Sequence, residues 1–146
     1  MPAYLKSDAA AIEALRSKGY KATPQRIAIY EIINSFEEHP TAEDIHNEVL
    51  KKFPSLSLST VYQVLHLLRD LGEVTELKLS NHSSKFETKS EIHINLICPK
   101  CDTILDYHSD AVNTVWSEVE NEFDFKPISQ RIDVYRYCDA CKETIK

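Results

Sequence analysis

The four cysteines of this 146-residue chain fall into two Cys-x-x-Cys pairs, and this arrangement limits the possible folds more than any other feature. Cys98 and Cys101 form the first pair, and Cys138 and Cys141 form the second. Two residues between cysteines allow both thiolates of one turn to reach the same ion, so two such turns can supply a closed, tetrahedral Zn2+ site. The alternatives are two disulfides or four buried thiols. The spacing predicts a structural Zn2+ and a small domain between the pairs.

The size and composition of the chain limit its fold and its location. A chain of 146 residues with 42% hydrophobic residues suffices for one or two small domains, each of which would bury little surface alone. We therefore expect a metal ion or dimerisation to stabilise them. No run of residues resembles a membrane span or a secretory signal. These features predict a cytoplasmic protein with no membrane partner, in which reduced thiols favour metal over disulfides.

The charge of the chain restricts how it could contact nucleic acid. A net charge of −6 at pH 7 argues against a general nucleic-acid coat. It is compatible with a local basic face, because attraction to phosphates decays within a Debye length of about 8–10 Å. Only two glycines occur in the chain, so it has no glycine-rich phosphate loop. We expect no small-molecule substrate.

The N-terminal part reads as helices followed by a β-hairpin. Thr23 and Pro24 form a clear helix start, because threonine caps well and proline suits the first helical position. Thr41 with Asp44 forms a short capping box, and Gly72 ends the last helix. This order is typical of a winged helix-turn-helix, although other folds share it. The expected helices are 7–18, capped by Ser7, then 24–36, 42–52 and 57–71, and the expected strands are 74–79 and 85–88.

The fourth expected helix has the composition of a DNA-contacting surface. No acidic residue occurs from Ser55 to Leu68, and the apolar residues of this helix can face inward. Hydroxyl and amide groups can bond to phosphates and base edges without the repulsion that a carboxylate would cause. The alternative is an ordinary amphipathic helix with a neutral face. The candidate DNA-binding residues are Arg26, Ser57, Ser59, Thr60, Tyr62 and Gln63.

The C-terminal part reads as a small α+β domain. Residues 92–97 and 103–107 alternate like half-buried strands, and residues 128–137 alternate again before the second cysteine pair. Between them, residues 110–123 form an amphipathic helix. Such a domain after a short DNA-binding unit most often dimerises. The helix residues expected to face inward are Val112, Val115, Trp116 and Val119.

Several hard and borderline metal ligands are not explained by the cysteine pairs. Imidazole and carboxylate groups suit Fe2+, Mn2+, Zn2+ or Ni2+ without selecting sharply among them. The alternative is that each histidine is an ordinary surface or core residue. These ligands are His39, Glu87, His93, Asn95, Asp106 and His108.

The chain resembles the ferric uptake regulator family, and it is most similar to the peroxide-stress repressor branch. The resemblance covers nearly the whole chain, and its motifs occur in the family's order and spacing. The matching stretches are Thr23-Pro24-Gln25-Arg26, His39 to Ile45, Ser59-Thr60-Val61-Tyr62, Ser84-Lys85-Phe86-Glu87, His93 with Cys98 and Cys101, and Tyr135 to Cys141.

The resemblance implies a dimeric repressor that binds a pseudo-palindromic operator. It implies a winged-helix DNA-binding domain at 1–84, a hinge at 85–92 and a dimerisation and metal-binding domain at 93–146. It also implies a regulatory Fe2+ or Mn2+, with Zn2+ possible, between the two domains. Asn95 stands where the family commonly has a second histidine, and Gln130 stands where some members have another metal ligand. The implied regulatory ligands are His39, Glu87, His93 and Asp106.

Four functions are compatible with these features. The first is repression relieved when peroxide oxidises His39 or His93 beside Fe2+, and the second is regulation of metal uptake without oxidation. The third is a metalloenzyme, which the chain does not favour because it offers no nucleophile or phosphate loop. The fourth is a zinc-stabilised interaction module that does not need the N-terminal part. We therefore expect a regulator and not an enzyme.

Overall fold

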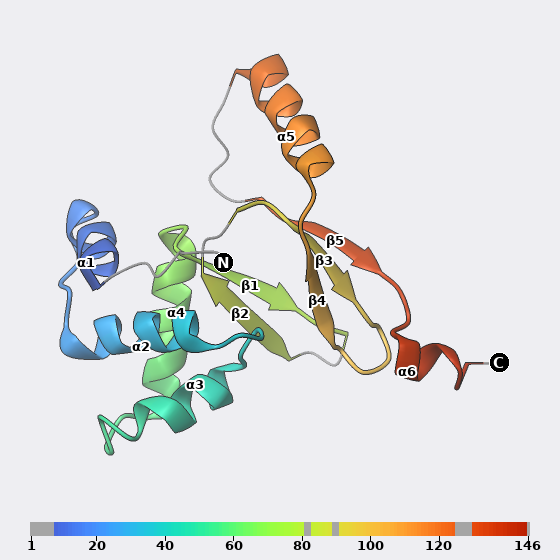
Figure 1. Ribbon diagram of the computed structural model, residues 1–146. Coiled ribbons are helices and arrows are strands. Elements are labelled where there is room, and N and C mark those ends of the chain that lie inside the picture. Colours follow the sequence, from blue (N-terminus) through green and yellow to red (C-terminus); the bar gives the residue numbers. More distant parts are fainter. Residues whose placement is uncertain (1–7, 81–82, 89–90, 125–129, 146) are drawn as a thin grey trace. The chain divides into compact units, whose positions relative to one another are not determined.

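The computed structural model describes residues 8–80, 83–88, 91–124 and 130–145 (Figure 1). The chain divides into two compact units, Met1–Ser90 and Glu91–Lys146. The first contains helices and a hairpin, and the second contains a three-stranded sheet with two helices. Among the described residues, no helix combines the length and apolarity that crossing a membrane requires.

The described part of the first unit contains four helices, and two of them start at the predicted caps Thr23 and Thr41. The hydroxyl of Thr23 accepts a hydrogen bond from the backbone N–H of Arg26, and Ser57 does the same for Thr60. Thr41 and Asp44 form a complete capping box. The predicted cap Ser7 lies outside the described residues. The helices are α1 (Asp8–Ser17), α2 (Pro24–Ser35), α3 (Ala42–Val49) and α4 (Leu58–Asp70).

A two-stranded hairpin completes this unit and its core. β1 (Val74–Lys78) pairs with β2 (Ser84–Thr88) in antiparallel register. Gly72 has a φ of 77°, which only glycine adopts readily, so it ends α4 and turns the chain into β1. Fully buried side chains from the helices and the hairpin, among them Ile29, Ile45 and Phe86, share one core. The predicted order of helices and hairpin is confirmed.

The second unit is built on a sheet with strand order β4-β3-β5. The central strand β3 (Ile94–Ile97) pairs antiparallel with β4 (Ile104–Tyr107) and parallel with β5 (Ile132–Tyr135). α5 (Asp110–Phe123) lies in the connection from β4 to β5, and α6 (Asp139–Lys142) follows β5. Of the predicted strand 128–137, the first two residues lie outside the described part.

The strand register places a row of three polar residues on one face of this sheet and only apolar or aromatic residues on the other face. Asn95 pairs with Asp106 on one side and with Asp133 on the other, so the three residues form a row on one face. Because side chains alternate along a strand, the neighbouring positions lie on the opposite face. That face is apolar, and Leu105 on it is 62% exposed. Its residues are Ile94, Leu96, Leu105, Tyr107, Ile132 and Val134.

The expectation that Val115 of α5 faces inward is wrong for the single chain. Val115 is 57% exposed, and no residue of α5 is buried. Val112, Trp116 and Val119 are only half-buried. An amphipathic helix hides its apolar stripe only when another apolar surface covers it, and the described residues of this unit leave Val115 exposed.

Candidate metal centres and nucleic-acid interface

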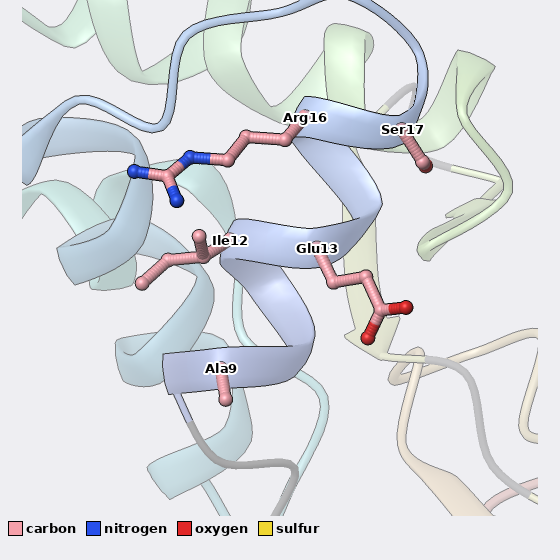
Figure 2. A pocket seen from close by; sticks show the side chains of 5 residues that line it. All are labelled: Ala9, Ile12, Glu13, Arg16 and Ser17. Atoms are coloured by element: carbon pink, nitrogen blue, oxygen red, sulfur yellow. The ribbon is translucent and has the colours of Figure 1, made fainter.

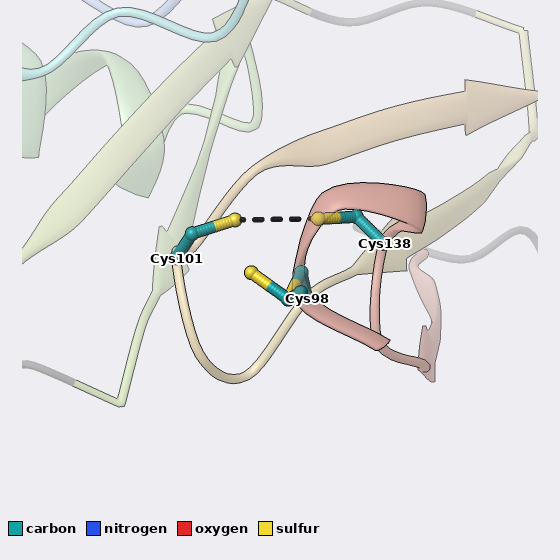
Figure 3. Close-up of side chains that lie close together, drawn as sticks. Cys98, Cys101 and Cys138 are labelled. Atoms are coloured by element: carbon teal, nitrogen blue, oxygen red, sulfur yellow. Dashed lines mark hydrogen bonds between the residues drawn. The ribbon is translucent and has the colours of Figure 1, made fainter. Parts of the chain in front are cut away.

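The four cysteines converge at one end of the second unit. Cys98 follows β3, where its N–H donates to the carbonyl of Thr103 and its own carbonyl accepts from the N–H of Asp102. This tight turn carries Cys101, and Asp102 within it has a left-handed φ of 59°. Cys138 directly precedes α6 at its N-cap position, and Cys141 lies within this short helix. Both loops therefore present two sulfurs each to the same place, as the close-up of Cys98, Cys101 and Cys138 illustrates (Figure 3).

The sulfur positions fit a tetrahedral ion. All four Sγ atoms lie within 4.8 Å of one another, and the Sγ atoms of Cys101 and Cys138 are 3.7 Å apart. Sulfurs on a tetrahedral Zn2+ with bonds of 2.3 Å would be about 3.8 Å apart. The four thiols are free, so the alternative of two disulfides is not found. The cluster agrees with the prediction from the cysteine spacing.

The electrostatics of the cluster also favour a cation. A hydrogen bond from the backbone of Cys138 is the largest effect on Cys98, and it contributes to lowering the pKa of that thiol to about 6. In contrast, hydrogen bonding with Cys138 and burial raise the pKa of Cys141 to about 12. Neighbouring thiols therefore resist complete ionisation without a positive charge. A divalent ion removes this resistance because it stabilises each thiolate directly.

In the first unit, His39 and Glu87 meet because two segments pair locally. The N–H of Phe86 in β2 donates to the carbonyl of Pro40 at 2.8 Å, and Thr41 forms an isolated bridge with Lys85. This pairing places Nε2 of His39 2.5 Å from Oε2 of Glu87. The side chains are 8% and 17% exposed, so the pair is shielded from bulk water. An imidazole and a carboxylate in this arrangement can bind a divalent metal ion.

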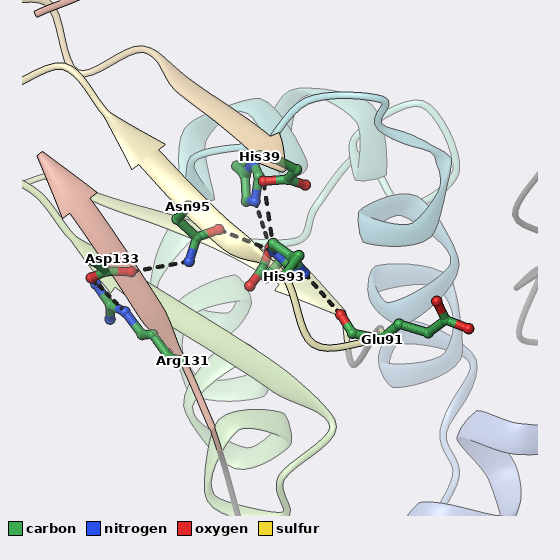
Figure 4. Close-up of polar contacts among 8 residues, drawn as sticks. His39, Glu91, His93, Asn95, Arg131 and Asp133 are labelled. Atoms are coloured by element: carbon green, nitrogen blue, oxygen red, sulfur yellow. Dashed lines mark hydrogen bonds and ion pairs between the residues drawn. The ribbon is translucent and has the colours of Figure 1, made fainter. Parts of the chain in front are cut away.

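In the second unit, His93 and Asn95 (Figure 4) form another group of metal-binding atoms together with Asp106. Nε2 of His93 is 3.0 Å from Oδ1 of Asn95 and 3.6 Å from Oδ1 of Asp106. The other ring nitrogen, Nδ1, is 2.9 Å from the carbonyl oxygen of Glu91. The ring of His108 lies beside that of His93, with centroids 5.2 Å apart. His93 and Asn95 are both buried, which is unusual for polar residues and indicates a specific role.

The candidate DNA-binding residues differ in how much of each side chain is exposed. Ser59 and Gln63 are exposed on α4, opposite its buried face. Ser57 caps the helix and lies 2.9 Å from the hydroxyl of Thr60, so both residues have a structural contact. The hydroxyl of Tyr62 donates to Glu43 at 3.3 Å.

Arg26 already has intramolecular contacts. It donates from Nη1 to the carbonyl of Lys21 at 2.8 Å, and its guanidinium lies over the ring of Tyr20. A guanidinium has further donors, so phosphate binding remains open to it.

One surface hollow has no link to these groups. It lies along α1 and is lined by Ala9, Ile12, Glu13, Arg16 and Ser17 (Figure 2). Because one helix supplies every lining residue, the hollow is an open helix face and not a cleft between elements. No predicted site residue contributes to it.

Sequence reasoning missed Asp133, which contacts the group around His93. Nδ2 of Asn95 donates to Oδ1 of Asp133 at 3.0 Å, and Arg131 binds the other carboxylate oxygen. Alternation in residues 128–137 indicated a strand, but the partner of that strand and its register had no local signal. The contact depends on the parallel pairing of β3 with β5.

Comparisons with known proteins agree with this architecture. The sequence model of the Ferric uptake regulator family matches residues 17–135. The chain is 36% identical over 132 residues to the peroxide-responsive repressor PerR of Staphylococcus epidermidis, covering 90% of this chain and 88% of the relative. The structure of the Campylobacter jejuni peroxide stress regulator is similar, with a TM-score of 0.69 and 28% identity over 89% of this chain and 98% of that chain. The Helicobacter pylori ferric uptake regulator has a TM-score of 0.73 at 23% identity, over 93% and 94% of the two chains, which confirms the predicted fold.

Proposed function

Because this chain belongs to the ferric uptake regulator family, we propose that it is a metal-dependent, DNA-binding transcriptional repressor that responds to peroxide. The observation that carries this proposal is the similarity to peroxide-responsive repressors along almost the whole chain. The two sets of metal-binding atoms and the winged-helix unit supply the parts that such a regulator needs. In this proposal the protein acts on DNA in the cytoplasm. It regulates transcription and does not catalyse a reaction.

Two kinds of metal ion have separate tasks in this proposal. Zn2+ on Cys98, Cys101, Cys138 and Cys141 holds the second unit together and has no open coordination position. An exchangeable Fe2+ or Mn2+, or alternatively Zn2+, is the regulatory ion. Its ligands are His39, Glu87, His93 and Asp106, which the chain presents as two pairs of imidazole and carboxylate.

The regulatory ion would link DNA binding to the metal and redox state of the cell. His39 and Glu87 belong to the first unit, whereas His93 and Asp106 belong to the second. Ligands from both units on one ion would make operator affinity depend on that ion. Bound Fe2+ would activate hydrogen peroxide beside the two histidines. One peroxide oxygen would then be added to a ring carbon of His39 or His93, and the other would leave as water. Mn2+ would leave both side chains intact.

The second unit is the proposed dimerisation unit. The apolar sheet face, with Leu105 and Tyr107 exposed, and the exposed Val115 and Phe123 of α5 belong to the same unit. A monomer would leave these apolar side chains in water, and clustered exposed apolar side chains often mark a surface that a partner covers. A second copy of the chain is the natural partner, because a two-fold dimer presents two identical DNA readers to a pseudo-palindromic operator.

The proposed DNA reader is α4 within residues 1–84, with residues 85–92 as the hinge and 93–146 as the dimerisation and metal-binding domain. Ser59 and Gln63 are placed for base or phosphate contacts because they are exposed on α4. Thr60 and Tyr62 lie on the same helix, and Ser57 at its N-terminus can add a phosphate contact. Arg26 is the cationic candidate for a phosphate.

A peroxide experiment tests this function. Protein loaded with Zn2+ and Fe2+ is bound to its operator and treated with a small excess of hydrogen peroxide, and anisotropy and peptide masses are followed in parallel. We expect loss of DNA binding together with a one-oxygen gain on the peptide of His39 or His93. The peptide of His66, whose side chain is 45% exposed, is the internal control and should keep its mass.

The outcomes separate the candidate functions. Mn2+-loaded protein should remain on DNA under the same treatment. Release of Fe2+-loaded protein without any modified histidine would contradict the oxidation chemistry. Metal-dependent binding that peroxide leaves unchanged in both forms would instead support a metal-uptake regulator.

A further inference from the structure

Three polar side chains form a row across the sheet of the second unit. The register pairs Asp106 of β4 with Asn95 of β3, and Asn95 with Asp133 of β5. Paired residues of adjacent strands project from the same face, so the amide of Asn95 lies between two carboxylates. Asn95 is only 1% exposed, and a buried amide of this kind needs defined partners.

Asp133 fixes the orientation of the Asn95 amide. Oδ1 of Asp133 lies 3.0 Å from Nδ2 of Asn95. An ionised carboxylate can only accept hydrogen bonds, so the NH2 group of Asn95 must face Asp133 and its oxygen must face His93. Arg131 in turn donates from Nε and Nη2 to Oδ2 of Asp133, at 2.9 and 2.5 Å. These charge-assisted bonds hold the carboxylate in place (Figure 4).

His93 has an equally defined orientation. Its Nδ1 lies 2.9 Å from the carbonyl oxygen of Glu91, which can only accept, so Nδ1 carries the proton. In the neutral ring, Nε2 then has a lone pair that faces Oδ1 of Asn95 at 3.0 Å. Neighbouring ligands of an octahedral ion with bonds of about 2.1 Å are about 3.0 Å apart, so the two atoms suit one shared ion.

We propose that Asp133, held by Arg131, is a positioning residue that turns the side-chain oxygen of Asn95 toward the regulatory ion as a ligand. The inference rests on the proposed function, because it concerns the same exchangeable ion. Asp133 does not touch the ion and acts through Asn95. A neutral amide oxygen replaces an imidazole in the donor set, and oxygen ligands suit Mn2+ better than imidazole does.

The test measures Mn2+ affinity without DNA. Zinc-containing protein that has been freed of exchangeable metal is titrated with Mn2+, and free Mn2+ is followed by electron paramagnetic resonance. We expect Asn95→Ala and Asp133→Ala each to weaken binding by about 10- to 100-fold, the usual effect of losing a ligand or its orienting partner. Glu118→Ala is the matched control, because it removes one negative charge from an exposed position of the same unit.

A double variant shows whether Asp133 acts through Asn95. If it does, Asp133→Ala adds less than about twofold in the Asn95→Ala background, because the shared interaction is already lost. Equal losses in both backgrounds would overturn the proposal. Asp133→Asn keeps the size of the side chain and one accepting oxygen, so it should lose less Mn2+ affinity than Asp133→Ala. If the alanine variant does not fold, Asp133→Asn replaces it in the same measurement.

A spectroscopic measurement distinguishes positioning from a merely structural role. Protein labelled with 13C in the asparagine carboxamides should show hyperfine coupling to bound Mn2+ that disappears in Asn95→Ala. At saturating Mn2+, the coupling should also be lost in Asp133→Ala. Persistence of the coupling in that variant would overturn the role of Asp133.

A failure of the proposed function would look different. If the wild-type protein binds no exchangeable Mn2+, or if His93→Ala binds as tightly as wild type, the regulatory centre itself is refuted. If His93→Ala abolishes binding while Asn95→Ala matches wild type, only the inference about Asn95 and Asp133 is refuted.

Discussion

Asp124, the residue that ends α5, destabilises the C-terminal end of this helix. It adopts a left-handed conformation, with φ 49° and ψ 50°, directly after the last residue of α5. A non-glycine residue is strained there, and its negative charge lies near the negative end of the helix dipole. Asp124→Gly should therefore raise the free energy of unfolding by about 0.5–1 kcal/mol, as measured by urea denaturation of the zinc-loaded protein.

The control for this prediction is a glycine variant of Asp70, the last residue of α4. Asp70 lies inside the right-handed end of α4, where glycine brings no relief of strain. Asp70→Gly should lower the free energy of unfolding by up to about 1 kcal/mol. Equal changes in the two variants would refute the conformational explanation.

Residue-level signals also explain which parts of the site could be predicted. Thr23, Thr41 and Ser57 start helices at the predicted places because a cap acts on backbone groups within three residues. The cysteine spacing predicted the thiol cluster for the same reason, because the two cysteines of each pair lie in one turn. Asp133 could not be found in this way, because its bond to Asn95 joins positions 38 residues apart and depends on strand register.

At the scale of elements, an ion pair joins the proposed DNA-reading helix to the hairpin. Nη1 of Arg69 in α4 donates to Oε1 of Glu76 in β1 at 2.7 Å, and the hydroxyl of Ser84 in β2 donates to the other oxygen. Burial by itself raises the pKa of Glu76, but the hydrogen bonds from Ser84 and Arg69 outweigh this effect and lower the pKa. The three elements are therefore connected through one carboxylate.

This connection predicts a pH-dependent loss of stability. Because the folded-state pKa of Glu76 is lowered, its contribution is complete above the unfolded-state value of about 4.3 and is lost as the pH falls through the folded-state value. Glu76→Gln should cost about 1–2 kcal/mol at pH 7, and the difference from wild type should vanish in strong acid.

Urea denaturation as a function of pH checks this expectation. Glu48→Gln is the control, because Glu48 pairs with Lys51 in an exposed ion pair that water screens. It should change the stability by less than about 0.5 kcal/mol at any pH. A constant deficit of Glu76→Gln at all pH values would contradict the electrostatic origin.

At the scale of the whole molecule, the sequence could not show which surface covers the apolar residues of the second unit. The pattern of α5 correctly indicated an amphipathic helix, yet periodicity identifies an apolar stripe without identifying the surface that covers it. Val115 was therefore expected to lie in the core of its own chain, whereas it is exposed. The exposed side chains of the sheet face and of α5 are explained together if a second chain covers both.

Leu105→Lys tests this explanation directly. Leu105 is 62% exposed, so a lysine fits the folded unit without loss of its own core packing, but it would place a charge in the proposed interface. We expect the variant to remain folded and zinc-bound while light scattering or sedimentation shows monomers. Operator affinity should then fall by roughly 100-fold or more, because each monomer contacts one half-site without the effective concentration that linkage gives. Tyr20→Lys changes an exposed aromatic residue of the first unit and should remain dimeric, whereas a dimeric Leu105→Lys would show that this sheet face is not the interface.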